Sequence, residues 1–344
     1  MAGYTPGETT VHTSVAEIGR VTRALRATAR PVVLVPTMGA LHEGHLELVR
    51  AAQSLPRAVV VVSIFVNPLQ FGDGADLDSY PRTLDADVEK LRKLGVELVF
   101  APSVREMYPN GFRTTVSAGP LAEELEGAAR PGHFDGALTV CLKLFNVTNC
   151  SDAVFGEKDY QQLVLMQQLV TDLNLPVQLH SVPVIRENDG LAMSSRNVRL
   201  DDASRQAAVA LSAALTLGAH CGDQGVDAVL TGARSVLDSV PGVEVDYLEL
   251  RDGRLTRLPG DVGEGEARLL VAARVGGVRL LDNVGVILGD LQTRREKEIA
   301  QAALHAAGLD AELSDEEMAE LRRLREKVQE IRSSRRGGSG DSRE

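Results

Sequence analysis

Two histidines three residues apart, His42 and His45, are the residues whose types and spacing first suggest chemistry in this chain. They lie in PTMGALHEGHL (residues 36–46), where an apolar run enters a turn and a helix is predicted to begin near His42. A spacing of three puts both imidazoles on one face of the first helical turn. The free amides and the positive dipole end of that turn would lie where open α/β sheets bind ligands, so we expect a bound anion such as phosphate.

Two other roles are open to this histidine pair. Zinc ligation is typical of helical histidines four residues apart with a third ligand, whereas this pair has a spacing of three. A structural role would leave Gly39 and Gly44 unexplained, because glycine weakens a helix and indicates close approach by another group. Phosphate binding therefore accounts for the segment best.

Three further segments place polar side chains after predicted apolar strands. MSSRN (residues 193–197) offers two hydroxyls and the Arg196 guanidinium, which suit a polyphosphate, although the serines could instead only cap the next helix. SIFVNPLQF (residues 63–71) contains Gln70, and FGEKDYQQ (residues 155–162) contains Lys158 and Gln162. In an arbitrary protein Lys158 would be a solvated surface lysine, and the glutamines would be ordinary polar residues at helix starts.

Together the four segments resemble those of the pantoate:β-alanine ligase (pantothenate synthetase) family, in the HxGH nucleotidyltransferase superfamily, from about residue 11 to residue 287. The resemblance implies that ATP adenylates pantoate with release of pyrophosphate. β-Alanine then attacks the pantoyl adenylate to give pantothenate (vitamin B5), a precursor of coenzyme A, and AMP. The chain departs from the family at residues 148–152, where an apolar-x-Pro-Asp strand entry is expected, and this puts the local packing in question.

The resemblance also implies site residues. It makes His45 the proton donor and His42 and Lys158 further catalytic groups, although an imidazole could equally supply only hydrogen bonds. It places Gln70 against pantoate and β-alanine, and Gln162 against pantoate. The implied ATP contacts are Met38, Gly39, Ala40, Leu41, His42, Glu43, Gly44, His45, Gly156, Glu157, Lys158, Asp159, Ile185, Met193, Ser194, Ser195 and Arg196.

An acidic run after Gln70 could suggest a metal site. Asp73, Asp76 and Asp78 lie beside Gly72 and Gly74, however, and this composition is more typical of a mobile flap. We expect Tyr80 and the turn at residues 130–133 to close over the site, since water would hydrolyse an acyl adenylate. Mg²⁺ is expected to arrive with ATP and to be held mainly by phosphate oxygens and water, with no dedicated protein ligands.

The elements that must position these residues can be predicted from hydrophobic periodicity. Apolar β-branched runs occur at residues 31–35, 58–66, 96–101, 153–155 and 177–184, and helical spacing occurs at residues 42–54, 84–94, 137–145 and 160–173. Such alternation predicts an α/β fold with a Rossmann-like, doubly wound parallel sheet, spanning residues 1–185.

A smaller α+β domain is predicted over residues 186–290. Helices are expected at residues 201–220 and 226–239, followed by an antiparallel sheet from residues 243–250, 267–275 and 278–286, with a turn at Gly276-Gly277. Residues 291–344 are predicted to form a charged helical tail, partly disordered, that either folds back on its own domain or forms an intermolecular coiled coil.

Composition limits the alternatives. The 344 residues carry 37 Lys and Arg against 48 Asp and Glu, a net charge of −11, and only 3% aromatics, which disfavours nucleic acid and a tRNA synthetase. Three cysteines without a CxxC motif and no long apolar stretch predict a cytoplasmic protein outside the membrane. Another adenylyltransferase, or an interaction protein with a vestigial site, remains an alternative. The family resemblance implies a homodimer.

Overall fold

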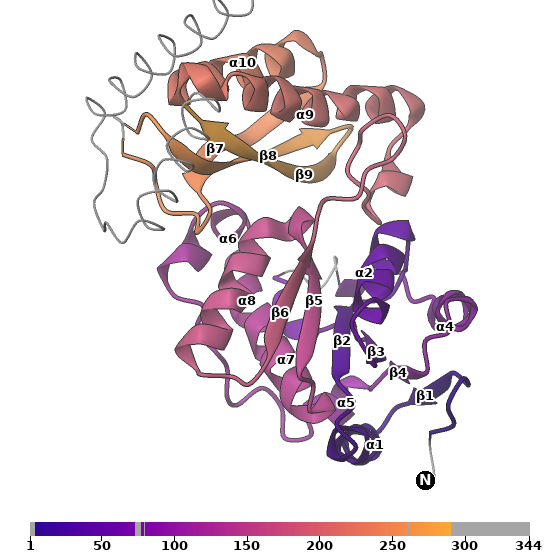
Figure 1. Cartoon of the computed structure of the whole chain (residues 1–344). Helices are drawn as coiled ribbons and strands as arrows, with labels where there is room; N and C mark the ends of the chain where they lie inside the picture. The colour runs from indigo at the N-terminus through magenta and orange to yellow at the C-terminus, as the bar shows by residue number, and fades with distance from the viewer. Residues whose placement is uncertain (1–3, 73–76, 79, 260–261, 290–344) are drawn as a thin grey trace, which may run out of the picture.

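In the computed structural model, the described residues are 4–72, 77–78, 80–259 and 262–289. They form a parallel sheet flanked by helices and, at the other end of the molecule, a smaller sheet covered by two helices (Figure 1). The predicted flap residues Asp73 and Asp76 and the predicted tail at residues 291–344 lie outside the described residues.

The large sheet confirms the doubly wound prediction. Its six strands lie in the order β1-β4-β3-β2-β5-β6, and every neighbouring pair is parallel. The strands are β1 (Thr10–His12), β2 (Val32–Thr37), β3 (Val59–Ile64), β4 (Leu98–Phe100), β5 (Asp152–Gly156) and β6 (Gln178–Val182).

Alternating valines explain why helices cover both faces of this sheet. In β2, Val32 and Leu34 pack into a core on the side of α1 and α7, whereas Val33 and Val35 pack on the side of α2 and α4. Side chains in a strand alternate between faces, so a strand with no polar position requires an apolar partner on each side. The helices are α1 (Val15–Ala27), α2 (Glu43–Gln53), α4 (Leu84–Lys93), α5 (Val104–Met107), α6 (Glu126–Ala129), α7 (His133–Thr148) and α8 (Tyr160–Asp172).

The segment that departs from the family pattern packs regularly. After α7, Asn149 takes a left-handed conformation with φ of 46°, and Cys150 is buried at 4% exposure. The Ser151 amide then donates to the Val32 carbonyl at 3.0 Å, which aligns β5 beside β2. An asparagine tolerates the left-handed region, so the chain enters β5 without a proline.

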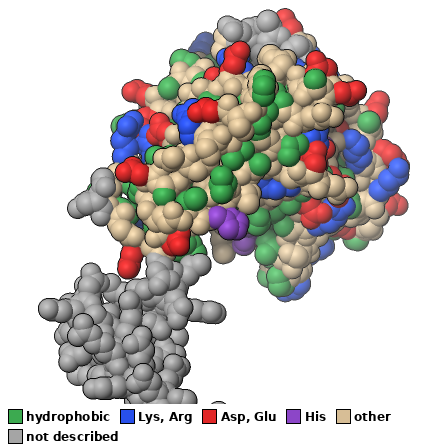
Figure 2. Space-filling model, turned by 90° about the horizontal axis from the view of Figure 1, so that it is seen from above, with side chains coloured by type: hydrophobic (Ala, Val, Ile, Leu, Met, Phe, Trp, Pro, Cys, Tyr) green, Lys and Arg blue, Asp and Glu red, His purple; other side chains and the backbone are tan. Residues whose placement is uncertain are grey.

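The second unit also follows the prediction. Helices α9 (Asp202–His220) and α10 (Val226–Ser239) cover an antiparallel sheet of β7 (Val243–Asp252), β8 (Gly265–Val275) and β9 (Val278–Leu288). Gly276 and Gly277 make the β8-β9 turn with φ of 56° and 78°, values that favour glycine. The face of the molecule seen from above carries acidic and basic side chains interspersed with apolar ones (Figure 2). In the described part of the chain, no helix combines the length and apolarity needed to cross a membrane.

Candidate active site

The candidate site lies where the strand order of the large sheet reverses. From β2, the chain continues to β3 and β4 on one side and returns to β5 and β6 on the other. In open parallel sheets, ligands bind beyond the carboxyl ends of the strands at such a point. A cleft of about 290 Å³ lies there. It collects most of the predicted site residues: Met38, His42, Gly44, His45, Gln70, Gly156, Lys158, Asp159, Gln162, Ile185, Met193, Ser194, Ser195 and Arg196.

His42 and His45 cap the first turn of α2 reciprocally. The Gly44 amide donates to His42 Nδ1 at 3.2 Å, and the His42 amide donates to His45 Nδ1 at 3.4 Å. A ring nitrogen that accepts a hydrogen bond carries no proton, so in the neutral rings the proton lies on Nε2. Both histidines line the cleft, and each therefore retains one N–H donor for a ligand.

The environment of these rings keeps them neutral. Burial lowers the pKa of His45 to about 3, with the neighbouring His42 and Lys158 acting in the same direction. Burial and the charge of Lys158 also lower the pKa of His42. At neutral pH the pair thus offers hydrogen bonds without positive charge, which favours the hydrogen-bonding role for His45 over proton donation in the free protein.

The zinc alternative gains no support, because the described residues include no group of three His, Cys, Asp or Glu side chains placed to hold a metal ion.

Part of the backbone that the sequence suggested for phosphate is already bonded within the protein. Asp87, a fully buried residue of α4, accepts from the amides of Ala40 at 2.9 Å and Leu41 at 2.8 Å. The Gly39 amide donates to Thr37 Oγ1 at 3.3 Å, and Gly39 itself has φ of 87°, which favours glycine. A carboxylate therefore fixes the turn before α2 and uses amides that a phosphate would otherwise meet.

Gly44 is required for a different reason. A Cβ added there would lie 2.9 Å from Cε1 and 3.0 Å from Nδ1 of His42. The close approach that the sequence predicted at this glycine is therefore made by the His42 ring, which could not cap the helix beside a larger residue.

Five of the predicted ATP contacts are not part of the cleft lining: Gly39, Ala40, Leu41, Glu43 and Glu157. Leu41 is buried in the core between α2 and α4, with 2% exposure. Glu43 pairs with Arg50 on the helix surface, and Glu157 pairs with Arg268 at 2.9 Å. Contact of these five residues with ATP stays a prediction.

Gln70 is held in place from two sides. Its side chain accepts a hydrogen bond from Asn67 Nδ2 at 3.1 Å and donates to the sulfur of Met38 at 3.1 Å. The ring of His133 donates from Nδ1 to the Gln70 carbonyl at 2.8 Å, and burial together with the charge of Arg130 lowers the pKa of His133 to about 4. The glutamine is thus a pre-positioned amide at the cleft wall.

The two glutamines at the start of α8 have different roles. Gln162 lines the cleft. Gln161 is buried and bonds backbone groups of the preceding loop, donating to the carbonyls of Leu121 at 2.8 Å and Glu124 at 2.9 Å and accepting from the Glu126 amide at 2.9 Å. This pattern supports the prediction that Gln162, and not its neighbour, is available to a substrate.

Positive charge collects in the cleft although the chain as a whole is acidic. Lys158 Nζ lies 3.7 Å from Asp159, and its side chain is 20% exposed. Burial raises the pKa of Asp159, but the charges of Lys158 and Arg196 outweigh that effect and lower it. Arg130 also lines the cleft, as do His133 and Tyr80, so the two segments expected to close over the site border it.

The serines of the MSSR segment do not cap α9. The Met193 amide donates to the Ile185 carbonyl at 2.9 Å, and Ser194 Oγ accepts from the Arg196 amide at 3.2 Å. Asp201 caps α9 instead, accepting from the Ser204 amide at 2.8 Å. The structural alternative for these serines is therefore wrong.

Sequence reasoning missed Asp87. The residue lies four positions before Leu91, which is fully buried, and residues four apart share a helix face. A carboxylate on the buried face of an amphipathic helix therefore indicated that it accepts hydrogen bonds from donors inside the protein. Nothing in the sequence identified the amides of Ala40 and Leu41 as those donors.

Comparison with known proteins adds independent information. A family model described as Pantoate-beta-alanine ligase matches residues 10–285. The pantothenate synthetase of Corynebacterium jeikeium (strain K411) is 64% identical over 286 residues, covering 83% of this chain and 92% of the relative. That of Nocardia farcinica (strain IFM 10152) is 60% identical over 286 residues, covering 83% and 89%.

Solved structures are similar as well. The crystal structure of pantothenate synthetase from Thermus thermophilus matches with a TM-score of 0.72 and 45% identity, covering 80% of this chain and 98% of that one. Pantoate-beta-alanine ligase from Francisella tularensis, complexed with beta-gamma ATP and beta-alanine, matches with a TM-score of 0.66 and 33% identity, covering 80% and 97%.

Proposed function

The chain belongs to the pantoate-beta-alanine ligase family, enzymes that use ATP to condense pantoate with β-alanine, and we propose that the cleft described above performs this ligation through pantoyl adenylate. One observation carries the proposal. Donors suited to phosphate oxygens, from His42, His45, Lys158 and the Ser194–Arg196 loop, line the same cleft as the amides of Gln70 and Gln162. The cleft can therefore hold a polyphosphate and a small hydroxy acid side by side.

In the first step a pantoate carboxylate oxygen bonds to the α-phosphorus of ATP, and the bond to the β-phosphate breaks. Negative charge increases on the phosphate oxygens in the transition state. The Nε2 donors of the neutral histidines, the charge of Lys158 and the guanidinium of Arg196 stabilise it without rearrangement. Gln70 and Gln162 orient pantoate, since an amide can donate to a carboxylate and accept from a hydroxyl.

In the second step the β-alanine amine attacks the acyl carbon, and AMP leaves with the former carboxylate oxygen. Lys158 remains close to the acyl phosphate, whereas the pyrophosphate that Arg196 held has departed. A mixed anhydride is a far better electrophile than a carboxylate, which is why the adenylate must precede the amide. Tyr80 and Arg130 border the cleft and limit access of water to this intermediate.

Mg²⁺ is expected to enter with ATP. It would neutralise charge on the phosphates and polarise them for attack. The described residues provide no three-ligand group for a metal, and phosphate oxygens with water suffice for magnesium. Asp159 lies 3.7 Å from Lys158, and the charges of Lys158 and Arg196 already stabilise its carboxylate.

The family resemblance further predicts a homodimer that works in the cytoplasm. Light scattering of the purified protein tests the dimer, because a dimer has twice the 36.9 kDa mass of one chain. Fractionation of cells tests the location.

The two chemical steps give a direct test of the residue roles. We expect Arg196→Ala to slow adenylation by about 100-fold or more, the usual effect of removing one preorganised donor. The reaction of supplied pantoyl adenylate with β-alanine should stay within about tenfold of wild type. Lys158→Ala should slow both steps. Rapid-quench measurement of each half-reaction provides the data, with Arg20→Ala, an exposed arginine of α1, as the control. Equal losses in both steps for Arg196→Ala would contradict the assignment.

A further inference from the structure

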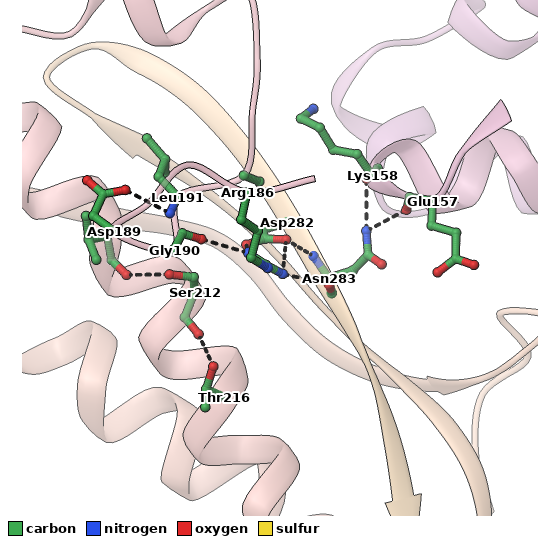
Figure 3. A network of polar contacts seen from close by, with 12 residues as sticks. Glu157, Lys158, Arg186, Asp189, Gly190, Leu191, Ser212, Thr216, Asp282 and Asn283 are labelled. Atoms are coloured by element: carbon green, nitrogen blue, oxygen red, sulfur yellow. Dashed lines mark hydrogen bonds and ion pairs between the residues drawn. The ribbon is translucent and has the colours of Figure 1, made fainter. Parts of the chain in front are cut away.

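Two neighbouring residues of β9 bond the turn that carries Lys158 and the segment that leads into the Ser194–Arg196 loop. Asp282 and Asn283 are buried, with 3% and 2% exposure. Such polar residues lie more commonly on the solvent-facing side of a strand. Both residues belong to the small second unit, whereas Lys158 lies in the turn Glu157–Asp159, which follows β5 of the large sheet (Figure 3). A buried polar pair at this position requires partners, and its partners are functional loops.

Asn283 holds the turn that carries Lys158. Its Nδ2 donates to the backbone carbonyls of Glu157 at 3.0 Å and Lys158 at 2.9 Å. Its Oδ1 accepts from Arg268 Nε at 2.7 Å, so both ends of the amide are bonded. The Lys158 side chain extends away from Asn283, which therefore fixes only the backbone from which the lysine reaches (Figure 3).

Asp282 holds the other loop. Its carboxylate accepts two hydrogen bonds from Arg186, one of them at 3.0 Å, and Arg186 also donates to the Gly190 carbonyl at 3.1 Å. Arg186 and Ala192 form an antiparallel bridge at the base of the loop that leads directly into Met193 and the serines. The same carboxylate accepts from the backbone amide of Asn283 at 2.7 Å, so the contacts of Asp282 and those of Asn283 form one hydrogen-bond network (Figure 3).

We propose that Asp282 and Asn283 are positioning residues that set the separation between Lys158 and the Ser194–Arg196 loop for adenylation. The proposal rests on the proposed function, which assigns both loops to the phosphates of ATP. Donors that contact different phosphates of one ATP molecule must keep a suitable separation, and two adjacent residues of one paired strand hold the segments that carry these donors. Neither residue lines the cleft that the proposed function assigns to ATP.

The competing explanation is that the pair only joins the two units. That interface contains other polar contacts that touch neither loop, such as Tyr247, whose hydroxyl donates to Glu126 at 3.0 Å. Tyr247→Phe removes one such contact and provides a matched control. If Asp282 and Asn283 only hold the two units together, this control and a variant of Asn283 should have the same rate of adenylation.

Asn283→Asp is the most informative variant because it preserves size and the bond to Arg268. The carboxylate cannot donate to the carbonyls of Glu157 and Lys158 and repels them. We expect adenylation to slow by about 10-fold to 100-fold, with kcat affected more than the KM for ATP, since a misplaced donor loses transition-state contact first. The melting temperature is measured in parallel and should fall more than in the Tyr247→Phe control, because the variant places a buried carboxylate against two carbonyls.

A double-mutant cycle separates positioning from stability. If Asn283 acts through Lys158, then Asn283→Asp should cost less than about twofold in a Lys158→Ala background. The same cycle run on the dissociation constant of ATP, by calorimetry, should show the same loss of effect. Equal fold-losses with and without the lysine, or wild-type kinetics for Asn283→Asp, would overturn the proposal.

Two further measurements test the proposal if Asn283→Asp does not fold or if the proposed function is wrong. If Asn283→Asp fails to fold, Asp282→Asn keeps only one of the two oxygens that accept from Arg186 and should slow adenylation at least about fivefold. Wild-type kinetics for that variant would also overturn the proposal. If the wild-type protein forms no AMP from pantoate, ATP and β-alanine, the proposed function is wrong, and the calorimetric cycle still decides whether Asn283 positions Lys158 for ATP.

Discussion

Replacement of Asp87 by asparagine should weaken both the fold and the turnover of this enzyme, because one carboxylate fixes the turn before His42 and His45. Asp87 is fully buried and accepts from the Leu41 amide through one oxygen and from the Ala40 amide and Thr83 hydroxyl through the other. An asparagine keeps one acceptor but directs an NH₂ group at the second set of donors.

The size of the effect follows from these contacts. One hydrogen bond to a charged acceptor is lost, at roughly 1.5 to 3 kcal/mol, and a buried backbone N–H is left without a partner, at roughly 1 to 3 kcal/mol. These two effects add to roughly 2.5 to 6 kcal/mol. Because the Thr83 hydroxyl can rotate and accept from the new amide, we expect a smaller total of about 2 to 4 kcal/mol. The turn would also relax, and a displacement of about 1 Å at His42 costs about 100-fold in rate.

Urea denaturation and steady-state turnover of Asp87→Asn measure the two effects. Asp85→Asn is the control, because Asp85 lies in the same helix turn but is exposed. The control should remain within about 0.5 kcal/mol of wild type. If Asp87→Asn proved as stable and as active as Asp85→Asn, the argument that a buried carboxylate organises the turn before His42 would be refuted.

Three other predictions concern the same site. Gly44→Ala should lower turnover about 10-fold to 100-fold, because the added Cβ displaces the His42 ring, even though alanine favours a helix more than glycine does. A steady-state assay at saturating ATP measures this effect, and unchanged turnover would contradict the prediction. His133 is buried beside Arg130 and has a folded pKa of about 4, so it contributes stability above about pH 6.5 that is lost as the pH falls toward 4. Between pH 7 and pH 5 the free energy of unfolding should fall by about 2 kcal/mol less in His133→Asn than in the wild type, as measured by urea unfolding at both pH values. An identical pH dependence in the variant would disprove this prediction. A chain that ends after Gly289 should keep full turnover, since the family match spans residues 10–285; loss of activity would show that the charged tail takes part.

The fold was predictable because its strands and turns carry local signals. Apolar β-branched runs such as residues 59–62 favour strands covered on both faces, and Gly276-Gly277 favours a tight hairpin. β1 and α1 were missed. β1 has only three residues, too few for a periodic pattern, and it forms because β4 offers it an edge.

The site was predictable to the extent that its residues follow strand ends. Parallel strands bring their carboxyl ends to one edge, which is why His45, Gln70 and Lys158 meet in one cleft. Contacts between distant segments could not be predicted. Nothing local indicates that Asp87 binds the Ala40 amide or that Asn283 holds the backbone of Lys158, because these contacts arise only when separate elements pack.

Exchange of labelled pyrophosphate into ATP tests the central claim most directly. If the cleft forms pantoyl adenylate as a discrete intermediate, the enzyme should catalyse exchange that requires pantoate and Mg²⁺ and proceeds without β-alanine. Arg196→Ala should reduce this exchange by about 100-fold. Formation of ADP and phosphate, or exchange that occurs only when β-alanine is present, would contradict the account.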